Sequence, residues 1–366
     1  MNDQRTKIRI GLIGLGQRGL ATLRRYEWIE GAEITALSDL SREAVERACH
    51  EMEIHGRHPA ETYYGESQWR RICESPNIDL VYICTDWSSH ARMAVYAMQQ
   101  GKHVAVEVPA AMSVNECWDL VYTAEATGRH CTMLENCCYD VFHLGIMGMI
   151  RAGLFGDITH CEGAYIHDLR DEQDNWRLQS IRRHQGNPYP THGLGPVCQL
   201  LDINRTDRLT TLVSMTGLNN INNTLIQTAR GRSILIQFDE NTPRPYNRLQ
   251  TLCATEGYAQ KYPRPTLQVS EQPAVFDEAA EALAARYQDD DIRQLIADGQ
   301  RLGVTNLMNY IMDRRLIDAL RSGRPLDISV YDAALWSCVT ELSALSVSQG
   351  SQPVAVPDFM RGSAHP

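Results

Sequence analysis

A glycine-rich segment near the N-terminus restricts the fold of this chain more than any other feature. The apolar run Ile8–Ile13 predicts a short strand, a Gly-x-Gly-x-x-Gly segment follows at once, and residues 20–28 predict a helix. In this context Gly14 permits a tight turn, Gly16 lets backbone approach a pyrophosphate, and Gly19 allows close helix–strand packing. The pattern is typical of a fold that binds a dinucleotide, with its phosphates at the start of the helix.

An acidic residue ends the second predicted strand. Asp39 closes the run Glu33–Asp39 and stands twenty residues after Gly19. A carboxylate at this place binds the ribose 2′-hydroxyl and repels a 2′-phosphate. An Asp at a strand end can also be an ordinary surface residue. With the glycines in place, we predict NAD as the cofactor rather than NADP.

Two further apolar runs, Leu80–Thr85 and His103–Val106, predict the third and fourth strands. Each is followed by polar residues, Asp86–His90 after one and Glu107–Pro109 after the other. Ligands bind outside the carboxyl ends of parallel strands. The alternation of strands and helices to about residue 130 predicts a doubly wound parallel sheet.

Length, charge and cysteine spacing narrow the class of protein. A chain of 366 residues suggests two domains, and we expect them at 1–130 and 131–366. The net charge of −10 argues against a nucleic-acid partner. Because no apolar run approaches about 18 residues and the start leads straight into a strand, we expect no membrane span, no signal peptide and a cytoplasmic protein. The eleven cysteines show no CxxC spacing, so we expect reduced thiols. The sequence also lacks the His and Cys spacing that is typical of a metal site.

The second half carries weaker patterns. Residues 271–303 are acidic and predict a helical, solvated face, whereas Leu316, Leu320, Leu335 and Leu342 are core candidates of two long helices. Predicted helices cover 141–152, 306–321 and 330–348, and predicted strands cover 158–165, 210–215, 225–228 and 233–239.

The segment Tyr189–Pro196 places two groups that can move protons three residues apart, Tyr189 and His192. A helix that begins near Pro190 would bring both to one side of its first turn. The glycines and the second proline predict a turn at which backbone approaches a ligand.

The strand endings resemble those of the glucose–fructose oxidoreductase / inositol dehydrogenase / MocA superfamily. The resemblance implies an α/β fold: an N-terminal Rossmann doubly wound parallel sheet and a C-terminal α/β domain with a large, mostly antiparallel sheet. Dehydrogenases of that superfamily carry Glu-Lys-Pro after the fourth strand, where the Lys relays a proton. Here Val108 stands in the Lys position, so the chemistry differs or its protons move through other groups.

The second half also resembles glycoside hydrolase family 109, the NAD-dependent α-N-acetylgalactosaminidases, in which Glu-Val replaces Glu-Lys. The matching segments fall in one order along the chain: Glu135–Tyr139, Gly156-Asp157, Tyr165–Arg170, Trp176-Arg177, Tyr189–Pro196, Leu201–Arg205, Pro243–Tyr246 and Val330–Ala333.

The family resemblance implies roles for particular residues. Implied NAD contacts, besides the three glycines, are Gln17, Arg18, Asp39, Trp87, His90, Glu107, Val108, Asn136 and Tyr189. Implied sugar contacts are Tyr165, Arg177, Tyr189, His192 and Tyr246, with proton transfer by His192, Tyr189 and Tyr165. Tyr165 also fits a core position in a strand, and Arg177 beside Trp176 also fits a surface stacking pair.

The implied reaction is a redox-neutral glycoside hydrolysis: oxidation at C3 by NAD, elimination, water addition and re-reduction, on a hexosaminide or related glycoside. It needs no pair of carboxylates of the kind that ordinary glycosidases use, and the sequence shows no convincing pair. Two alternatives stay open. The first is an NAD-dependent dehydrogenase or epimerase that acts on a sugar or cyclitol, and the second is a non-catalytic protein that senses NAD or a sugar.

Several segments depart from the family pattern. Segments near 171–175 and 218–224 are shorter, Asn306–Asn309 stands where Gly-Gly-Met-Asp is usual, and Asp86 replaces a usual Pro. Because such loops frame the sugar site, the sugar, its anomer and the aglycone stay open. By analogy with the superfamily we expect a homo-oligomer, a dimer or a tetramer.

Overall fold

The chain forms two units, each with its own β-sheet. The computed structural model describes residues 7–172 and 176–362. Unit 1 contains Met1–Leu134 and Gly299–Ala334, and unit 2 contains Glu135–Asp298 and Leu335–Pro366. The observed division lies close to the expected one near residue 130. We expected residues 131–366 to form one domain, whereas the structure returns residues 299–334 to unit 1.

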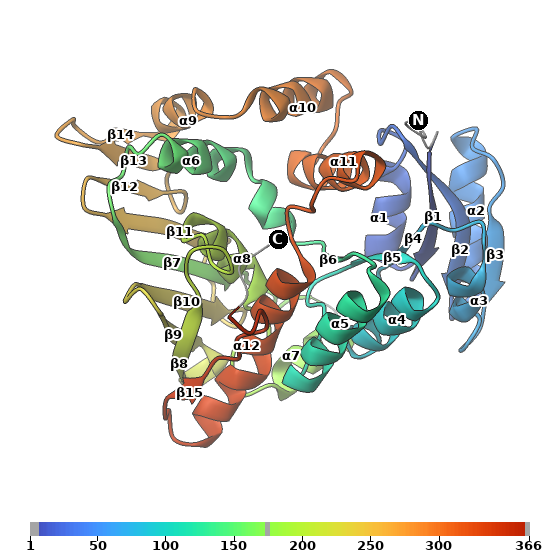
Figure 1. The fold of residues 1–366 in the computed structure, drawn as a ribbon, viewed down its shortest axis with the longest axis horizontal. Coiled ribbons are helices and arrows are strands. Elements are labelled where there is room, and N and C mark those ends of the chain that lie inside the picture. Colours follow the sequence, from blue (N-terminus) through green and yellow to red (C-terminus); the bar gives the residue numbers. More distant parts are fainter. Residues whose placement is uncertain (1–6, 173–175, 363–366) are drawn as a thin grey trace. The chain divides into compact units, whose positions relative to one another are not determined.

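Unit 1 holds a six-stranded parallel sheet in the order β3-β2-β1-β4-β5-β6, drawn from blue to cyan in Figure 1. This is the strand order of the doubly wound Rossmann fold, so the predicted fold class is confirmed. The strands are β1 (Ile8–Ile13), β2 (Ala32–Asp39), β3 (Glu61–Tyr64), β4 (Leu80–Ile83), β5 (His103–Val106) and β6 (Cys131–Met133).

The first helix of unit 1 begins earlier than predicted. Gly14 has a φ of +91°, and Gly16 is extended directly before α1. Because the chain turns into the helix at once, α1 covers Gln17–Arg25 instead of 20–28. The other helices of the Rossmann region are α2 (Arg42–Ile54), α3 (Trp69–Glu74), α4 (Trp87–Gln99) and α5 (Val114–Thr127).

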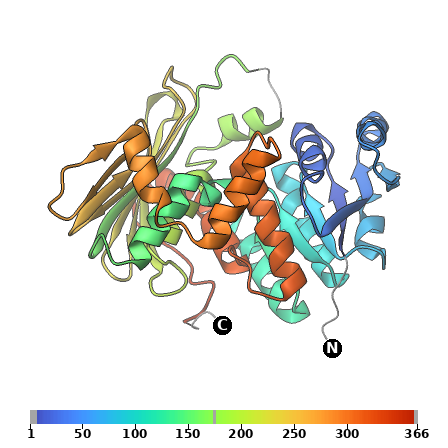
Figure 2. The ribbon, with the colours of Figure 1, turned by 90° about the horizontal axis from the view of Figure 1, so that it is seen from above.

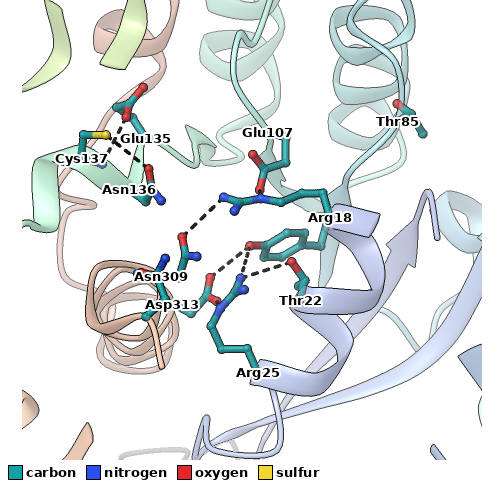
Figure 3. A network of polar contacts seen from close by, with 12 residues as sticks. Arg18, Thr22, Arg25, Thr85, Glu107, Glu135, Asn136, Cys137, Asn309 and Asp313 are labelled. Atoms are coloured by element: carbon teal, nitrogen blue, oxygen red, sulfur yellow. Dashed lines mark hydrogen bonds and ion pairs between the residues drawn. The ribbon is translucent and has the colours of Figure 1, made fainter. Parts of the chain in front are cut away.

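A helix from late in the chain completes unit 1. Helix α11 (Leu307–Ser322) supplies Asp313, which is fully buried and lies 2.6 Å from the Nε of Arg25 on α1 (Figure 3). The hydroxyl of Tyr82 on β4 donates to the same carboxylate at 3.1 Å. A buried arginine needs such a counter-ion, which is a physical reason for residues 299–334 to belong to unit 1. Helices α10 (Asp290–Arg301) and α12 (Val330–Ser348) each cross from one unit to the other.

Unit 2 holds a nine-stranded sheet in the order β14-β13-β12-β11-β7-β10-β9-β8-β15. Strands β7 and β10 are parallel and the other pairs are antiparallel, so the predicted mostly antiparallel sheet is confirmed. The strands are β7 (Ile158–Ile166), β8 (Leu209–Thr216), β9 (Asn222–Thr228), β10 (Ser233–Asp239), β11 (Asn247–Ala254), β12 (Gly257–Gln260), β13 (Thr266–Val269), β14 (Val275–Phe276) and β15 (Val354–Ala355).

Glycines let the helices of unit 2 pack closely. A Cβ on Gly148 of α6 would lie 1.8 Å from the carbonyl oxygen of Tyr287, and α6 and α9 lie side by side in Figures 1 and 2. The short 3₁₀ segments and helices within this unit are η1 (Asn136–Tyr139), α6 (Val141–Arg151), α7 (Trp176–Arg183), α8 (Thr191–Leu200), η2 (Leu218–Asn220) and α9 (Asp277–Ala285).

The segment Tyr189–Pro196 is only partly as predicted. Helix α8 begins at Thr191, so the predicted helix start is confirmed. The predicted turn is wrong, because the glycines and Pro196 lie inside the helix. A Cβ on Gly193 would lie 2.5 Å from the backbone nitrogen of Ala164 on β7. This glycine therefore lets the helix that carries His192 pack directly on the sheet.

Other predictions for the second half had mixed outcomes. Helix α6, helices α11 and α12, and strands β7 to β10 are confirmed within a few residues. Residues 271–303 are largely helical as predicted, but their solvated character is only partial, since Ala280, Ala284, Ile292 and Leu295 are buried. Leu320 is half-buried instead of core. Residues 173–175 of the shortened segment lie outside the described residues. No helix of the described residues is long and apolar enough to cross a membrane.

Candidate active site

A buried carboxylate holds His192 in the first turn of α8. Glu135 follows β6 by two residues and is fully buried, whereas the His192 side chain is 15% exposed. The Nδ1 of His192 lies 2.8 and 2.9 Å from the two oxygens of Glu135. Its Nε2 lies 3.5 Å from the hydroxyl of Tyr189. One ring nitrogen is thus fixed by a carboxylate, and the other is turned toward a phenol and available for proton transfer.

Each partner of this pair favours the charged form of the other. Burial alone would raise the pKa of Glu135, but the charge and hydrogen bond of His192 outweigh burial and lower it. Burial alone would lower the pKa of His192, but the sulfur of Cys137 and the carboxylate of Glu135 outweigh burial and raise it. These neighbours favour the imidazolium form of His192, in which Nε2 carries a proton.

Cys137 completes a compact group with Glu135 and His192. One sulfur, nitrogen or oxygen atom of each residue lies within 4.8 Å of the others. The backbone nitrogen of Cys137 donates to Glu135 at 3.2 Å, and its thiol donates to Asn136 at 3.5 Å (Figure 3). These donor types suit zinc, although the sequence predicted no metal site. Because Glu135 and His192 already pair through the same atoms, we interpret the group as an acid–base cluster.

Aromatic rings gather around Tyr165 of β7. Its ring centroid lies 4.8 Å from that of Tyr189 and 5.6 Å from that of His192. Its hydroxyl receives a hydrogen bond from the Nη2 of Arg177 at 3.0 Å and lies 3.0 Å from the Nδ1 of His167. Although Tyr165 is only 5% exposed, its hydroxyl thus sits in a polar group. The alternative of a purely apolar core position does not describe it.

The remaining predicted sugar contacts, Arg177 and Tyr246, also belong to this group. The guanidinium carbon of Arg177 lies 5.0 Å from the ring centroid of Tyr189. Burial lowers the pKa of Arg177, but the neighbouring oxygens of Tyr189, Tyr165 and Glu240 outweigh it and raise the pKa. Tyr246 is 43% exposed, and its ring lies 5.4 Å from that of His167. All five residues predicted to contact the sugar thus lie together in unit 2.

The alternative of a surface stacking pair for Arg177 and Trp176 does not describe Arg177. Trp176 is 47% exposed, whereas Arg177 is half-buried and contacts the two tyrosines.

Sequence reasoning missed three groups of this site. Glu135 is a single charge just after the buried strand β6, which is a signal that could have identified it. His167 lies two residues beyond Tyr165 and therefore on the same side of an extended chain. Glu240 follows β10, is 2% exposed and has a pKa that burial raises to about 7.

Unit 1 offers a cradle for a dinucleotide at the start of α1. A Cβ on Gly14 would lie 2.5 Å from the carbonyl oxygen of Cys84, and a Cβ on Gly19 would lie 1.9 Å from that of Gly14. Both positions therefore require glycine. At Gly16 no described atom lies within 4 Å of the Cβ position, which leaves space for a pyrophosphate. Among the described residues, no side chain caps α1, so its first N–H groups are available to phosphate.

Asp39 lies beside this cradle. One carboxylate oxygen accepts from the backbone nitrogen of Leu15 at 2.6 Å, and the other accepts from that of Ser41 at 2.9 Å. A carboxylate accepts about four hydrogen bonds, so Asp39 keeps capacity for ribose hydroxyls. The residues of unit 1 thus fit a dinucleotide.

Two predicted cofactor contacts pair with each other. The Nε of Arg18 donates to Glu107 at 2.5 Å, and its Nη2 donates to Asn309 of α11 at 3.4 Å (Figure 3). Arg18 is half-buried, and Gln17 beside it is exposed. This ion pair connects the start of α1 to the end of β5.

The other predicted cofactor contacts lie in different surroundings. Trp87 and His90 are buried in the first turn of α4. The ring nitrogens of His90 lie 2.7 Å from the carbonyl oxygen of Pro109 and 3.0 Å from that of Thr85. The ring therefore links the segments after β4 and β5, and its contact with a cofactor stays a prediction. Val108 is buried after β5, whereas Asn136 and Tyr189 belong to unit 2.

Comparison with known proteins assigns the family. Residues 8–134 match a family model described as "Oxidoreductase family, NAD-binding Rossmann fold". Residues 139–220 and 216–365 match one described as "Glycosyl hydrolase 109, C-terminal domain". A glycosyl hydrolase family 109 protein of Phocaeicola vulgatus is 50% identical, over 97% of this chain and 95% of its own. The chain belongs to glycosyl hydrolase family 109.

Family 109 relatives share nearly the whole length of this chain. An α-N-acetylgalactosaminidase of Bacteroides fragilis is 48% identical, over 97% of this chain and 92% of its own. The predicted resemblance is therefore confirmed. So is the prediction of an enzyme, since the chain is a member of a glycosidase family and has an NAD-binding Rossmann domain.

Solved structures share the fold of this family 109 chain at low sequence identity. A levoglucosan dehydrogenase in complex with NADH and levoglucosan has a TM-score of 0.76 at 17% identity, covering 96% of this chain and 100% of that one. An NAD binding oxidoreductase from Klebsiella pneumoniae has a TM-score of 0.77 at 17% identity with the same coverage. These matches establish the fold alone.

Proposed function

We propose that this chain hydrolyses an α-N-acetylgalactosaminide or a closely related glycoside by a redox-neutral route with bound NAD. The observation that carries the proposal is the position of His192, between the carboxylate of Glu135 and the hydroxyl of Tyr189, beside the Tyr165–Arg177 pair. Imidazole and phenol groups can move the protons of such a route, which does not require two carboxylates across the scissile bond. The similarity to an α-N-acetylgalactosaminidase supports the substrate class.

The cofactor would be held by the residues around the first helix. Gly16 leaves room for the pyrophosphate at the start of α1, and Gly14 and Gly19 allow the close backbone packing of this turn. Asp39 would accept hydrogen bonds from the ribose. When bound, NAD⁺ supplies a reversible oxidation at C3 of the sugar. Contacts from Gln17, Arg18, Trp87, His90, Glu107, Val108, Asn136 and Tyr189 are part of this proposal.

The protons would move through the group around His192. Glu135 keeps His192 charged, so Nε2 donates a proton toward Tyr189 or a sugar oxygen. Tyr189 in turn exchanges a proton with the C2 or C3 position. A guanidinium 3.0 Å from the hydroxyl of Tyr165 stabilises negative charge that develops on that oxygen during proton transfer. Tyr165 thereby assists departure of the aglycone.

The sugar would be held by the exposed edge of the same group. Arg177 offers several N–H donors, and Tyr246 offers a ring face on which a sugar can stack. We also propose, by analogy with the superfamily, that the protein is a homo-oligomer.

The test uses the purified chain with its bound NAD quantified. Nitrophenyl glycosides of both anomers, with and without a 2-acetamido group, are assayed for nitrophenol release while NADH absorbance is followed. Release of nitrophenol without net NADH supports the proposal. Net NADH accumulation would assign a dehydrogenase, and binding without turnover would assign a sensor.

A further inference from the structure

Glu240 is a buried carboxyl group with unused hydrogen-bonding capacity. It directly follows β10, and its backbone oxygen accepts from the nitrogen of Leu169 at 3.1 Å, so the main chain is fixed. The residue is 2% exposed, and its Oε2 has no hydrogen-bond partner among the described residues. A buried polar atom without a partner costs stability and so calls for an explanation.

The strand before Glu240 forms one wall of the candidate site. Strands β10 and β7 pair in parallel, with Phe238 opposite Tyr165. The two rings stack with centroids 6.2 Å apart and an angle of 18° between their planes. Glu240 lies two residues beyond Phe238, where the strand ends.

Charge also connects Glu240 with the sugar contacts. Its carboxylate contributes to the raised pKa of Arg177, which donates to the hydroxyl of Tyr165 at 3.0 Å. The Oε2 of Glu240 has no hydrogen-bond partner among the described residues, so Arg177 does not bond this oxygen. The carboxyl group is therefore near the guanidinium without being satisfied by it.

We propose that Glu240 is a substrate-binding residue, which accepts a hydrogen bond from a hydroxyl or amide N–H of the bound glycoside. The inference rests on the proposed function and adds a residue that determines specificity. Sugars carry many donors, and a buried oxygen without a partner gains more from one than an exposed oxygen does. A charged acceptor forms the stronger bond.

The ionisation of Glu240 makes this contact dependent on pH. Burial raises the pKa of Glu240 to about 7. The positive charges of Arg177 and Arg182 on α7 act to lower this pKa, and the negative charges of Asp239 and Glu172 act to raise it. Because the carboxylate is the better acceptor, affinity should rise as the pH increases through about 7.

The test measures binding of free N-acetylgalactosamine and of galactose to the full chain with bound NAD, by titration calorimetry. Glu240→Met removes the acceptor with little change in volume, and Glu240→Gln keeps an uncharged acceptor. Glu278→Gln, a change at an exposed acid of α9, is the matched control. We expect at least about 10-fold weaker binding for Glu240→Met. We expect a small loss and no pH dependence near 7 for Glu240→Gln, and no change for the control.

The thermal midpoint separates a binding role from a structural one. Replacing a buried carboxyl group that lacks a partner should leave the midpoint unchanged or raise it. A loss of binding at an unchanged thermal midpoint supports the proposal. If the affinity for N-acetylgalactosamine falls more than the affinity for galactose, the amide N–H of the sugar is the donor. Wild-type affinity in Glu240→Met, or a loss that accompanies a lower midpoint in both variants, overturns it. Failure of the wild-type chain to bind either sugar overturns the proposed function itself, which is a distinguishable result.

Discussion

The two units bury charged side chains in different ways. In unit 1, Arg25 is 8% exposed and Asp313 is fully buried. The guanidinium of Arg25 donates to the hydroxyls of Thr22 and Tyr82, and the hydroxyl of Tyr82 donates to the carboxylate of Asp313 (Figure 3). In unit 2, the Nε2 of His192 lies 3.5 Å from the hydroxyl of Tyr189, and the Oε2 of Glu240 has no partner among the described residues.

This difference separates structural from chemical use of buried charge. A closed network holds helices and strands together and has no capacity left for a ligand. A network that contains an unsatisfied polar atom is less stable, but that atom can bind a substrate or exchange a proton with it. Substitutions in the two networks should therefore affect different measurements.

The largest effect is expected on turnover, at His192. His192→Ala removes the proton donor and should lower kcat about 10,000-fold, which corresponds to about 5.4 kcal/mol. Bound NAD and the thermal midpoint should stay near wild type. The control is His160→Ala, since His160 also pairs with a glutamate but lies on β7 with 29% exposure. Near-normal turnover in His192→Ala would contradict the assignment.

The next largest effect is expected on stability, at Asp313 of unit 1. Asp313→Ala leaves Arg25 buried without its counter-ion and should lower the free energy of unfolding by about 3–5 kcal/mol. Urea denaturation measures this loss, with Asp318→Ala on the same helix as the control, since its side chain is 34% exposed. A stable Asp313→Ala variant that loses only activity would erase the contrast between the two networks.

A smaller effect on stability is expected in unit 2, at Gly193. The Cβ of Gly193→Ala would lie 2.5 Å from the nitrogen of Ala164, and the forced separation of α8 from β7 should cost about 1–3 kcal/mol. Turnover should also fall, because α8 carries His192. Gly217→Ala is the control, since its nearest described atom is 3.9 Å away. Equal midpoints for the two variants would show that this close approach is not needed.

The smallest effect is expected at Glu135. Glu135→Gln removes the charge that raises the pKa of His192, so this pKa should fall and the ring should lose its proton at lower pH. Turnover near neutral pH should fall about 10- to 100-fold, and the high-pH limb of the rate profile should move to lower pH. Glu162→Gln on β7, with 32% exposure, serves as control. An unmoved profile would show that Glu135 does not tune His192.

Local patterns predicted unit 1 well. Short buried strands alternate with helices there, and the glycine positions are dictated by backbone contacts that a sequence motif records. The shift of α1 to Gln17 was missed because the motif does not state how soon the helix begins.

Unit 2 was predicted less completely, for physical reasons. Leu249 and Gln250 have positive φ values, and the register of β11 shifts there, so the strand lacks a regular alternation. The role of Gly193 depends on β7, which lies about 30 residues earlier. The predicted sugar contacts were named through a family motif, whereas Glu240 emerges only when its burial and partners are known.

The late position of α11 affects how this protein matures during synthesis. Arg25 is made among the first residues, but its counter-ion Asp313 follows only after eight strands of the unit 2 sheet, β7 to β14. At ribosomal speeds of about 5–20 residues per second, Asp313 is synthesised roughly 10 to 40 s after the last strand of the Rossmann sheet. The N-terminal unit is therefore completed late in translation, and a nascent chain stopped before α11 should bind NAD poorly although its glycine cradle has already been synthesised.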